Sequence, residues 1–338
     1  MIMRKWLATA SLWTGCMLAG CDGPQNYMQA GGPAAAKLAS IGAFTLILFS
    51  LVSIVVLLLL LWVAVRRRGT LESHAPIDAD GGQRWILVGG IAVPVAVLAT
   101  VFVSSLQAMS HYPMSHQDGA AADIRVTGRQ WWFNAEYLGH TVHGRVNSPT
   151  EIHIPVGRPV DIELVTRDVI HSFWIPKLHG KVDLVPGMTN RIRIRADEPG
   201  VFSGECGEFC GAQHANMRLQ VVAQSAEEFD RWLRDQRANA REPQTSSQKI
   251  GQQVFMSAAC ALCHTVRGTP ALGQVGPDLT HVASRGHIAG GMLPNNRGTL
   301  TAWVSHAQEL KPGSRMPDLP GLTGEQLIAL SDYLQSLE

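Results

Sequence analysis

The stretch "CGEFCGAQHANM" (residues 206–217) places two cysteines, a histidine and a methionine within twelve positions. Its flanks, "EPGVFSGE" (198–205) and "MRLQVVA" (217–223), show the alternation and turn residues typical of β-strands. The cluster is therefore predicted to lie on a loop between two strands, where a rigid scaffold can position metal-binding side chains. On such a loop all four side chains can point toward one centre: Cys206, Cys210, His214 and Met217.

Short alternating segments continue upstream as "EIHIPVG" (151–157), "PVDIELVT" (159–166) and "NRIRIRA" (190–196). Several short strands with turn residues between them predict an all-β sandwich or barrel, here over residues 120–225. In the last segment Ile192 and Ile194 would face the core, while the arginines between them would face water.

The metal that fits this cluster depends on how many side chains join it. His171, in "VTRDVIHSFWIP" (165–176), follows a predicted strand and can be a further ligand. Two thiolates, two imidazoles and a thioether favour electron-transfer copper, and two bridging thiolates can hold two copper ions. A structural zinc with two cysteines and two histidines is an alternative, and so is a disulfide in an exported chain. Neither alternative uses Met217.

The order and spacing of these residues resemble the binuclear copper A site of cytochrome c oxidase subunit II. The resemblance covers residues 37–225 and implies a cupredoxin-like Greek-key sandwich that faces outward from a membrane. It implies two copper ions with the backbone carbonyl of Glu208 as one ligand and, as the others, His171, Cys206, Cys210, His214 and Met217. The Glu208 side chain would help to bind a non-redox Mg ion at the interface with subunit I.

The stretch "GRQWWFNAEY" (128–137) is similar to the family's aromatic patch, in which an exposed tryptophan receives electrons from cytochrome c. Trp131 aligns with that residue. By itself, an aromatic run in a strand favours core packing. The stretch departs from the family at Arg129, Trp132 and Phe133, where His, Tyr and Trp are more usual, so the sequence leaves the electron route through it open.

Two long uncharged apolar runs, 41–65 and 85–108, are each long enough to span a bilayer. A buried core helix is the alternative for each. Arginines flank the short connection between them, which places that connection on the cytoplasmic side and both ends of the predicted hairpin (37–110) outside. Many family members carry a Glu shortly before the second span, at a proton-channel entrance. Gly82 stands there, and Asp78 and Asp80 are the nearest carboxylates.

The N-terminus has the layout of a signal peptide over residues 1–20, with Arg4 and Lys5 before an apolar run. "LAGC" (18–21) resembles the lipobox of bacterial lipoproteins, which predicts that Cys21 is acylated. An ordinary signal peptide is the alternative. Asp22 is typical of lipoproteins that stay in the inner membrane. The sequence thus predicts a protein of the bacterial inner membrane, anchored in its lipids, with the copper and haem domains on the outer face.

"CALCH" (260–264) is the signature of covalent c-type haem attachment, with Cys260 and Cys263 as thioethers and His264 on the iron. A zinc half-site is the alternative, but no second pair follows at the right spacing. Met316 in "KPGSRMPDLPG" (311–321) is predicted as the second axial ligand, with Met292 as its competitor. The methionine loop and "GPDL" (276–279), where Pro277 backs the histidine, resemble small class I cytochromes c. This predicts an all-α domain over 249–338.

Residues 226–248 are predicted to link the two domains, with a mixed-charge helix followed by a polar tether, "REPQTSSQ" (241–248). A flexible tether of that length reaches about 15 Å. Near the C-terminus, Thr323 is predicted to cap a helix with Gln326 as its reciprocal partner.

Together these features predict subunit II of a bacterial cytochrome c oxidase with a fused cytochrome c domain. Electrons would pass from an external donor to the haem, through Trp131 or a neighbour to the copper pair, and on to subunit I, where oxygen is reduced with proton pumping; subunit III is a further expected partner. Quinol oxidase subunit II, nitrous oxide reductase and a copper-delivery module are the alternatives. The net charge of +1 argues against nucleic-acid binding.

Overall fold

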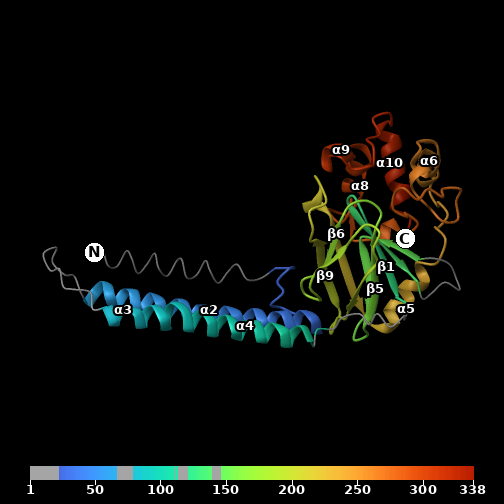
Figure 1. The fold of residues 1–338 in the computed structure, drawn as a ribbon. Helices are drawn as coiled ribbons and strands as arrows, with labels where there is room; N and C mark the ends of the chain where they lie inside the picture. Colours follow the sequence, from blue (N-terminus) through green and yellow to red (C-terminus); the bar gives the residue numbers. More distant parts are fainter. Residues whose placement is uncertain (1–22, 67–78, 111, 113–120, 139–145) are drawn as a thin grey trace, which may run out of the picture. The chain divides into compact units, whose positions relative to one another are not determined.

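A computed structural model describes residues 23–66, 79–110, 112, 121–138 and 146–338. The predicted signal peptide, Cys21 and most of the connection between the two apolar runs lie outside these residues. The chain divides into two compact units: residues 36–113 form one, and residues 1–35 with 114–338 form the other (Figure 1).

The first unit consists of two long apolar helices. Helix α2 (Pro33–Arg66) begins with a proline, which lacks the N–H that the first helical turn leaves unpaired. The second helix runs from α3 (Ala79–Trp85) through a π-helical segment, η2 (Ile86–Ala92), into α4 (Val93–Ser110). Pro94, just after the π-helical segment, accounts for it, because a proline cannot donate a hydrogen bond to the carbonyl four residues earlier. Both helices are long and apolar enough to cross a membrane.

The second unit contains a β-sandwich of two five-stranded sheets (Figure 1). One sheet has the strand order β3 (Val146–Pro149), β2 (Trp132–Tyr137), β1 (Ile124–Arg129), β5 (Val160–Thr166) and β8 (Asn190–Ile194). The other has the order β4 (Glu151–Pro155), β10 (Arg218–Gln224), β9 (Gly200–Cys206), β6 (His171–Trp174) and β7 (Val182–Leu184).

Alternation along these strands builds the sandwich core. In β1 and β2 every second residue is buried, and Ile192 and Ile194 of β8 are buried as the sequence predicts. The β6 and β9 strands pair antiparallel with Phe173 opposite Cys206. This register brings the start of β6 beside the end of β9, so residues far apart in the sequence meet at one end of the sandwich.

A helical domain follows, with α6 (Ser246–Ser257), α7 (Cys260–Cys263), α8 (Arg297–Ser305), α9 (Ala307–Leu310) and α10 (Gly324–Leu334). A short hairpin of β11 (His287–Ile288) and β12 (Leu293–Pro294) lies between them. Gly251 permits α6 to approach α10, because a Cβ there would lie 2.0 Å from the carbonyl oxygen of Ala329. Thr323 and Gln326 form the predicted capping box of α10. The predicted fold class, with apolar helices, sandwich and helical cytochrome domain, is confirmed.

The sandwich and the helical domain contact each other directly. Helix α5 (Ala226–Asp235) packs on the sandwich through Phe229 and Leu233, and the following segment bonds to the helical domain, where Arg267 donates to the carbonyl of Gln236. The sequence pattern predicts only a tether between the domains. The structure adds a docked interface, because hydrogen bonds join the sandwich to the loops of the helical domain.

Candidate copper centre and haem cavity

The predicted copper cysteines lie close together at the end of the sandwich. Strand β9 ends at Cys206, and the loop that follows returns Cys210 so that the two Sγ atoms are 3.7 Å apart. Both are buried free thiols. The backbone carbonyl of Glu208 lies 3.2 Å from Sγ of Cys206, inside the same turn. The loop thus directs two sulfurs and a carbonyl oxygen to one point.

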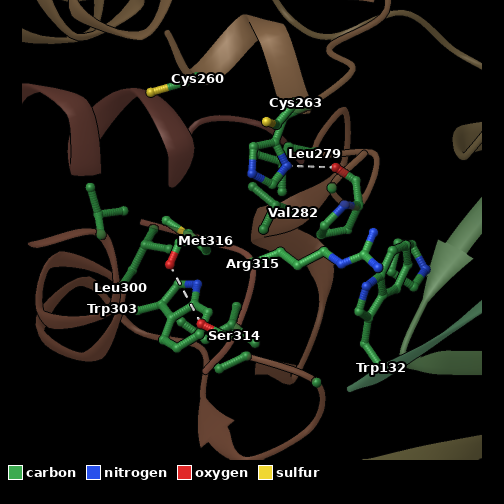
Figure 2. A pocket seen from close by; sticks show the side chains of 18 of the residues that line it. Trp132, Cys260, Cys263, Leu279, Val282, Leu300, Trp303, Ser314, Arg315 and Met316 are labelled. Carbon is green, nitrogen blue, oxygen red and sulfur yellow. Dashed lines mark hydrogen bonds between the residues drawn. The ribbon is translucent and has the colours of Figure 1, made fainter. Parts of the chain in front are cut away.

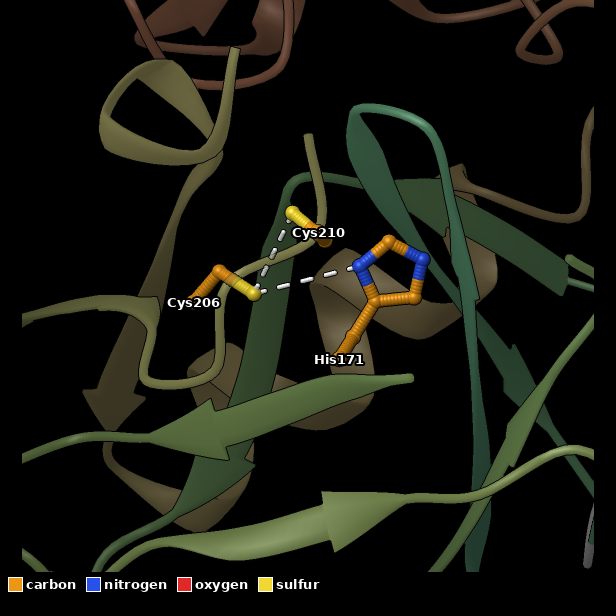
Figure 3. A group of neighbouring side chains, drawn as sticks. All are labelled: His171, Cys206 and Cys210. Carbon is orange, nitrogen blue, oxygen red and sulfur yellow. Dashed lines mark hydrogen bonds between the residues drawn. The ribbon is translucent and has the colours of Figure 1, made fainter. Parts of the chain in front are cut away.

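His171, the first residue of β6, reaches the same point from the neighbouring strand (Figure 3). Its Nδ1 is 3.8 Å from Sγ of Cys206, and its Nε2 is 2.8 Å from a carboxylate oxygen of Asp168. The carboxylate accepts the Nε2 proton, which leaves the Nδ1 lone pair facing the sulfurs. Carboxylates commonly orient metal-binding histidines in this way.

His214 and Met217 complete the group from the other side of Cys210. Nδ1 of His214 is 3.7 Å and Sδ of Met217 is 3.9 Å from Sγ of Cys210. Met217 is fully buried. The donor set, with two thiols, two imidazole nitrogens, a thioether and a carbonyl, has more ligands than one tetrahedral zinc uses. It would suit two soft copper ions.

The side chain of Glu208 points away from the cluster. It is 44% exposed, and its carboxylate lies 3.6 Å from Nζ of Lys181. Glu208 therefore presents its carbonyl to the thiols and its carboxylate to the surface of the described chain.

A second candidate site is an apolar cavity in the helical domain (Figure 2). Cys260, Cys263, His264 and Met316 all line it, whereas Met292 does not. Nδ1 of His264 is 2.8 Å from the carbonyl oxygen of Pro277, which keeps the proton on Nδ1 and leaves Nε2 free as a ligand. Apolar side chains make up much of the remaining wall: Phe255, Leu279, Val282, Leu300, Trp303 and Leu330.

The local backbone is shaped around this histidine. A Cβ at Gly276 would lie 2.5 Å from Cε1 of His264, so a larger residue would displace the ring. Burial lowers the pKa of His264, with a smaller opposing effect from the Pro277 carbonyl. The imidazole is therefore neutral near neutral pH, as an iron ligand requires. Two thiols, a neutral imidazole and a thioether around one apolar cavity fit a c-type haem.

Comparison with known proteins finds a family match for each of the two domains. Residues 140–225 match the family model described as cytochrome C oxidase subunit II, periplasmic domain, and residues 248–338 match the model for cytochrome c. A cytochrome c oxidase subunit 2 from Alkalihalophilus pseudofirmus is 34% identical over 328 residues, covering 95% of this chain and 94% of that protein. This chain belongs to the cytochrome c oxidase subunit II family.

Two further relatives show the breadth of this subunit II family. A cytochrome c oxidase subunit 2 from Bacillus sp. strain PS3 is 32% identical over 294 residues, covering 81% of this chain and 80% of that protein. A quinol oxidase subunit 2 from Bacillus cereus is 25% identical over 243 residues, covering 70% of this chain and 81% of that protein. Overall similarity therefore extends to subunits of both kinds of oxidase.

Hydrogen bonding between the two thiols of this subunit II shifts their pKa values in opposite directions. The contact with Cys210, together with His171 and backbone groups, lowers the pKa of Cys206. The same contact, reinforced by burial, raises the pKa of Cys210. Burial acts to lower the pKa of His171, but hydrogen bonds to Cys206 and Asp168 raise it overall. These contacts favour the ionised form at Cys206, and both thiols would give up their protons on binding copper.

Trp131 connects the copper loop to the cytochrome domain. Its Nε1 donates to the carbonyl of Cys210 at 3.0 Å, and only 9% of the residue is exposed. The cytochrome domain covers it: Nζ of Lys311 donates to the Trp131 carbonyl at 2.9 Å. Trp131 and Trp132 also line the haem cavity. The residue is thus part of the core, as its strand context favours, and also lies between the two sites.

Sequence reasoning missed three residues that hold this region together. Asp168 orients His171, and the side chain of Gln130 donates to the Cys210 carbonyl at 2.9 Å. Both stand beside quoted motifs, in "VTRDVIH" and "GRQWW". Lys311 is buried and donates to three backbone carbonyls, those of Trp131, Asn216 and Ala289. Nothing in the sequence separates it from a surface lysine.

Proposed function

We propose that this subunit II is the electron-accepting subunit of a terminal cytochrome c oxidase. It would receive electrons from an external donor at its own cytochrome domain and pass them to the oxygen-reducing centre of subunit I, with coupled proton pumping. Haem and copper, when bound, supply the one-electron redox chemistry. The placement of Trp131 between the copper thiols and the haem cavity carries this proposal.

The residues proposed to hold the copper pair are those that converge at the end of the sandwich. The carbonyl of Glu208 would bind together with His171, Cys206, Cys210, His214 and Met217. The short distances among their donor atoms support this set. The Glu208 carboxylate faces the surface beside Lys181, where it could meet a magnesium ion shared with subunit I.

The residues proposed to hold the haem are those of the apolar cavity. Cys260 and Cys263 would form the thioethers, with His264 and Met316 on the two faces of the iron. The orientation of His264 by the Pro277 carbonyl supports its role. Met316 is preferred over Met292 because it alone of the two lines the cavity.

Residues of this chain would set the path of the electron through their fixed positions and would not react themselves. Trp131 is held at both ends, by its own Nε1 on Cys210 and by Lys311 on its carbonyl. Fixed groups need little rearrangement when an electron passes. These two contacts support the proposed route from the cytochrome domain through Trp131 to the copper loop.

The membrane arrangement is proposed from the sequence together with the two apolar helices. The hairpin, over about 37–110, would place the copper domain (120–225) and the cytochrome domain (249–338) on the outer face of the bacterial inner membrane, joined by residues 226–248. Cleavage after residue 20 and acylation of Cys21 would add a lipid anchor. Mass spectrometry of the mature N-terminus tests that anchor, because an unmodified or uncleaved Cys21 would contradict it.

One experiment tests the central proposal. The full chain is purified in detergent after expression with copper and with haem c maturation. Metal content and the electron spin resonance spectrum of the oxidised form are measured, and haem is challenged with acidic acetone. We expect two coppers per chain, an electron shared equally between them, and haem that resists extraction.

Other outcomes of this experiment would contradict the proposed function. One copper, zinc or no metal would remove the electron-transfer role of the sandwich and favour a scaffold of the quinol oxidase type. Two coppers that exchange readily with a chelator and give no shared-electron spectrum would favour copper delivery. Extractable haem would contradict the roles of Cys260 and Cys263.

A further inference from the structure

Two residues that line the haem cavity each have a buried side-chain nitrogen without a hydrogen-bond partner. Among the described residues, four buried side-chain nitrogen or oxygen atoms have none, and two of these belong to residues that line this one cavity. They are Nε of Arg129, at the end of β1 in the copper domain, and Nδ1 of His287, in β11 of the cytochrome domain. Because native proteins rarely leave buried polar groups unpaired, the pair indicates an acceptor that is not part of the polypeptide.

Positive charge gathers where these atoms lie. Arg315, in the methionine loop, extends its guanidinium toward Trp132 (Figure 2). The guanidinium of Arg129 lies over the Trp132 ring, 5.7 Å from its centroid. Burial lowers the pKa of Arg129, and the charges of Arg167 and Arg315 lower it further. Like charges this close favour an anion between them.

The carboxylate whose charge acts on Arg129, that of Asp168, is already engaged. Asp168 accepts from Nε2 of His171 and from the backbone N–H of Gln130, each at 2.8 Å. Its remaining contacts are local, to Val169 and Thr166. Asp168 raises the pKa of Arg129 by its charge, but it gives Nε of that arginine no hydrogen bond.

Two other cations of the cavity wall are already engaged. Lys311 uses its ammonium group on three backbone carbonyls. Arg285 donates to the backbone carbonyl of Asp278. Arg315 adds a further positive charge to the wall, whereas Arg129 and His287, one from each domain, are the described lining residues with a buried side-chain nitrogen that has no partner.

We propose that Nε of Arg129 and Nδ1 of His287 donate to a propionate carboxylate of the haem, so that the copper domain helps to bind the haem of the cytochrome domain. The inference rests on the proposed function, because it requires a haem in this cavity. A haem carries two carboxylates and an otherwise apolar ring. The cavity matches this chemistry, with apolar side chains around the predicted iron ligands and partnerless donors at the wall shared with the sandwich. His287 would then carry its proton on Nδ1.

The proposed contact gives Arg129 a function at a position where this sequence differs from the family. The family more often has a histidine at this place, and a guanidinium is a longer donor with a permanent charge. An arginine from the sandwich that binds the haem carboxylate would also hold the cytochrome domain in its docked position. Haem binding and domain docking would then depend on one side chain.

The test compares two arginine variants of the full haem-loaded chain in detergent. Arg129→Gln removes the proposed donor. Arg167→Gln is the matched control, because it removes the same charge nearby from a residue that does not line the cavity. Loss of a cation that pairs with the propionate favours the oxidised haem. We expect Arg129→Gln to shift the reduction equilibrium about tenfold toward the oxidised form, equal to about 59 mV for one electron, and Arg167→Gln to shift it much less.

A second measurement monitors the haem propionate carboxylates directly. Haem labelled with ¹³C at its propionate carboxyls is incorporated, and the redox-induced infrared difference spectrum is recorded. We expect the labelled carboxylate bands to move in Arg129→Gln and in His287→Leu, and to stay in place in Arg167→Gln. Arg129→Lys keeps the charge but places the donor differently, so it should move the bands with a smaller change of potential.

The outcomes distinguish a contact between Arg129 and the propionate from a general effect of its charge. Equal potential shifts in the two arginine variants, with unmoved labelled bands, would overturn the inference and leave only a general charge effect. If Arg129→Gln does not retain haem, unmoved bands in Arg129→Lys and His287→Leu would overturn it in the same way. A wild-type chain without covalent haem would instead contradict the proposed function, so the two failures are distinguishable.

Discussion

The indole Nε1 of Trp131 donates a hydrogen bond of 3.0 Å to the backbone carbonyl of Cys210. The far edge of the same ring faces the methionine loop, where a Cβ at Gly313 would lie 3.5 Å from Cη2 of Trp131. One aromatic side chain therefore touches both the copper loop and the loop that carries Met316. Trp131 is buried, as its strand context favours, and its role in electron transfer stays a prediction.

Replacement of Trp131 by Phe should slow electron transfer between the cytochrome domain and the copper pair. Phe keeps the apolar packing but loses the hydrogen bond to Cys210 and the outer ring. We expect a fall of about tenfold, or about 1.4 kcal/mol in the barrier, measured by stopped-flow oxidation of the haem band. Trp232→Phe is the control, since Trp232 stacks on His153 away from both sites. An unchanged rate in Trp131→Phe would remove the residue from the route.

Asp168→Asn should weaken copper binding without removing a ligand. The amide can still occupy the space, but it no longer holds the Nε2 proton of His171 as a carboxylate does. Loss of such a supporting contact typically costs about 10–100-fold in metal affinity. Competition with a copper chelator measures the change. Asp197→Asn, at an exposed ion pair with Arg195, should leave the affinity unchanged, and equal affinities in both variants would contradict the role of Asp168.

Lys311→Met should loosen the docking of the two domains. The variant leaves the buried Trp131 carbonyl and the half-buried carbonyls of Asn216 and Ala289 without their charged donor. An unsatisfied buried group costs about 1–3 kcal/mol. Hydrogen exchange at the backbone N–H of Arg218, which bonds to Gly290 across the interface, should become faster. Lys249→Met is the control, because Lys249 is exposed on α6. Unchanged exchange would show that the other contacts suffice.

Acid should weaken a second contact between the domains. The backbone N–H of Gly286 donates to the Glu151 carboxylate at 2.6 Å. Burial acts to raise the pKa of Glu151, but hydrogen bonds to His153 and Gly286 and nearby positive charges hold it below its usual 4.5. A lowered pKa means that the ionised carboxylate stabilises the folded state above about pH 4.5, and that this contribution is lost as the pH falls through the lower value.

The measurement is the exchange protection of the Gly286 N–H as a function of pH. We expect protection to fall in acid in the wild type and to vary much less in Glu151→Gln, whose amide oxygen accepts without titrating. Glu198→Gln, at an exposed position, should retain the wild-type profile. Protection in Glu151→Gln that still falls with acid would assign the effect to another group.

Several features follow from the sequence alone because their chemistry lies within a few consecutive positions. Cys260, Cys263 and His264 form one short motif, and the apolar runs are long enough to predict membrane helices without any tertiary information. The copper loop carries most of its proposed ligands within twelve residues. The capping pair of Thr323 and Gln326 is likewise local, and the structure has it as predicted.

Contacts between segments distant in the sequence, and contacts made by backbone groups, were decided only by the tertiary structure. Pairing of β6 with β9 brings His171 to Cys206, and the choice of Nδ1 follows from Asp168 on the adjoining loop. In most of the contacts at the docked interface a side chain of one segment meets a backbone carbonyl or N–H of another. Backbone groups occur along the whole chain, so the sequence pattern does not show which of them will be partners. For the same reason the sequence predicts a tether where the structure has contact, and Lys311, Arg129 and His287 gain their roles only when the fold buries them against the partner domain.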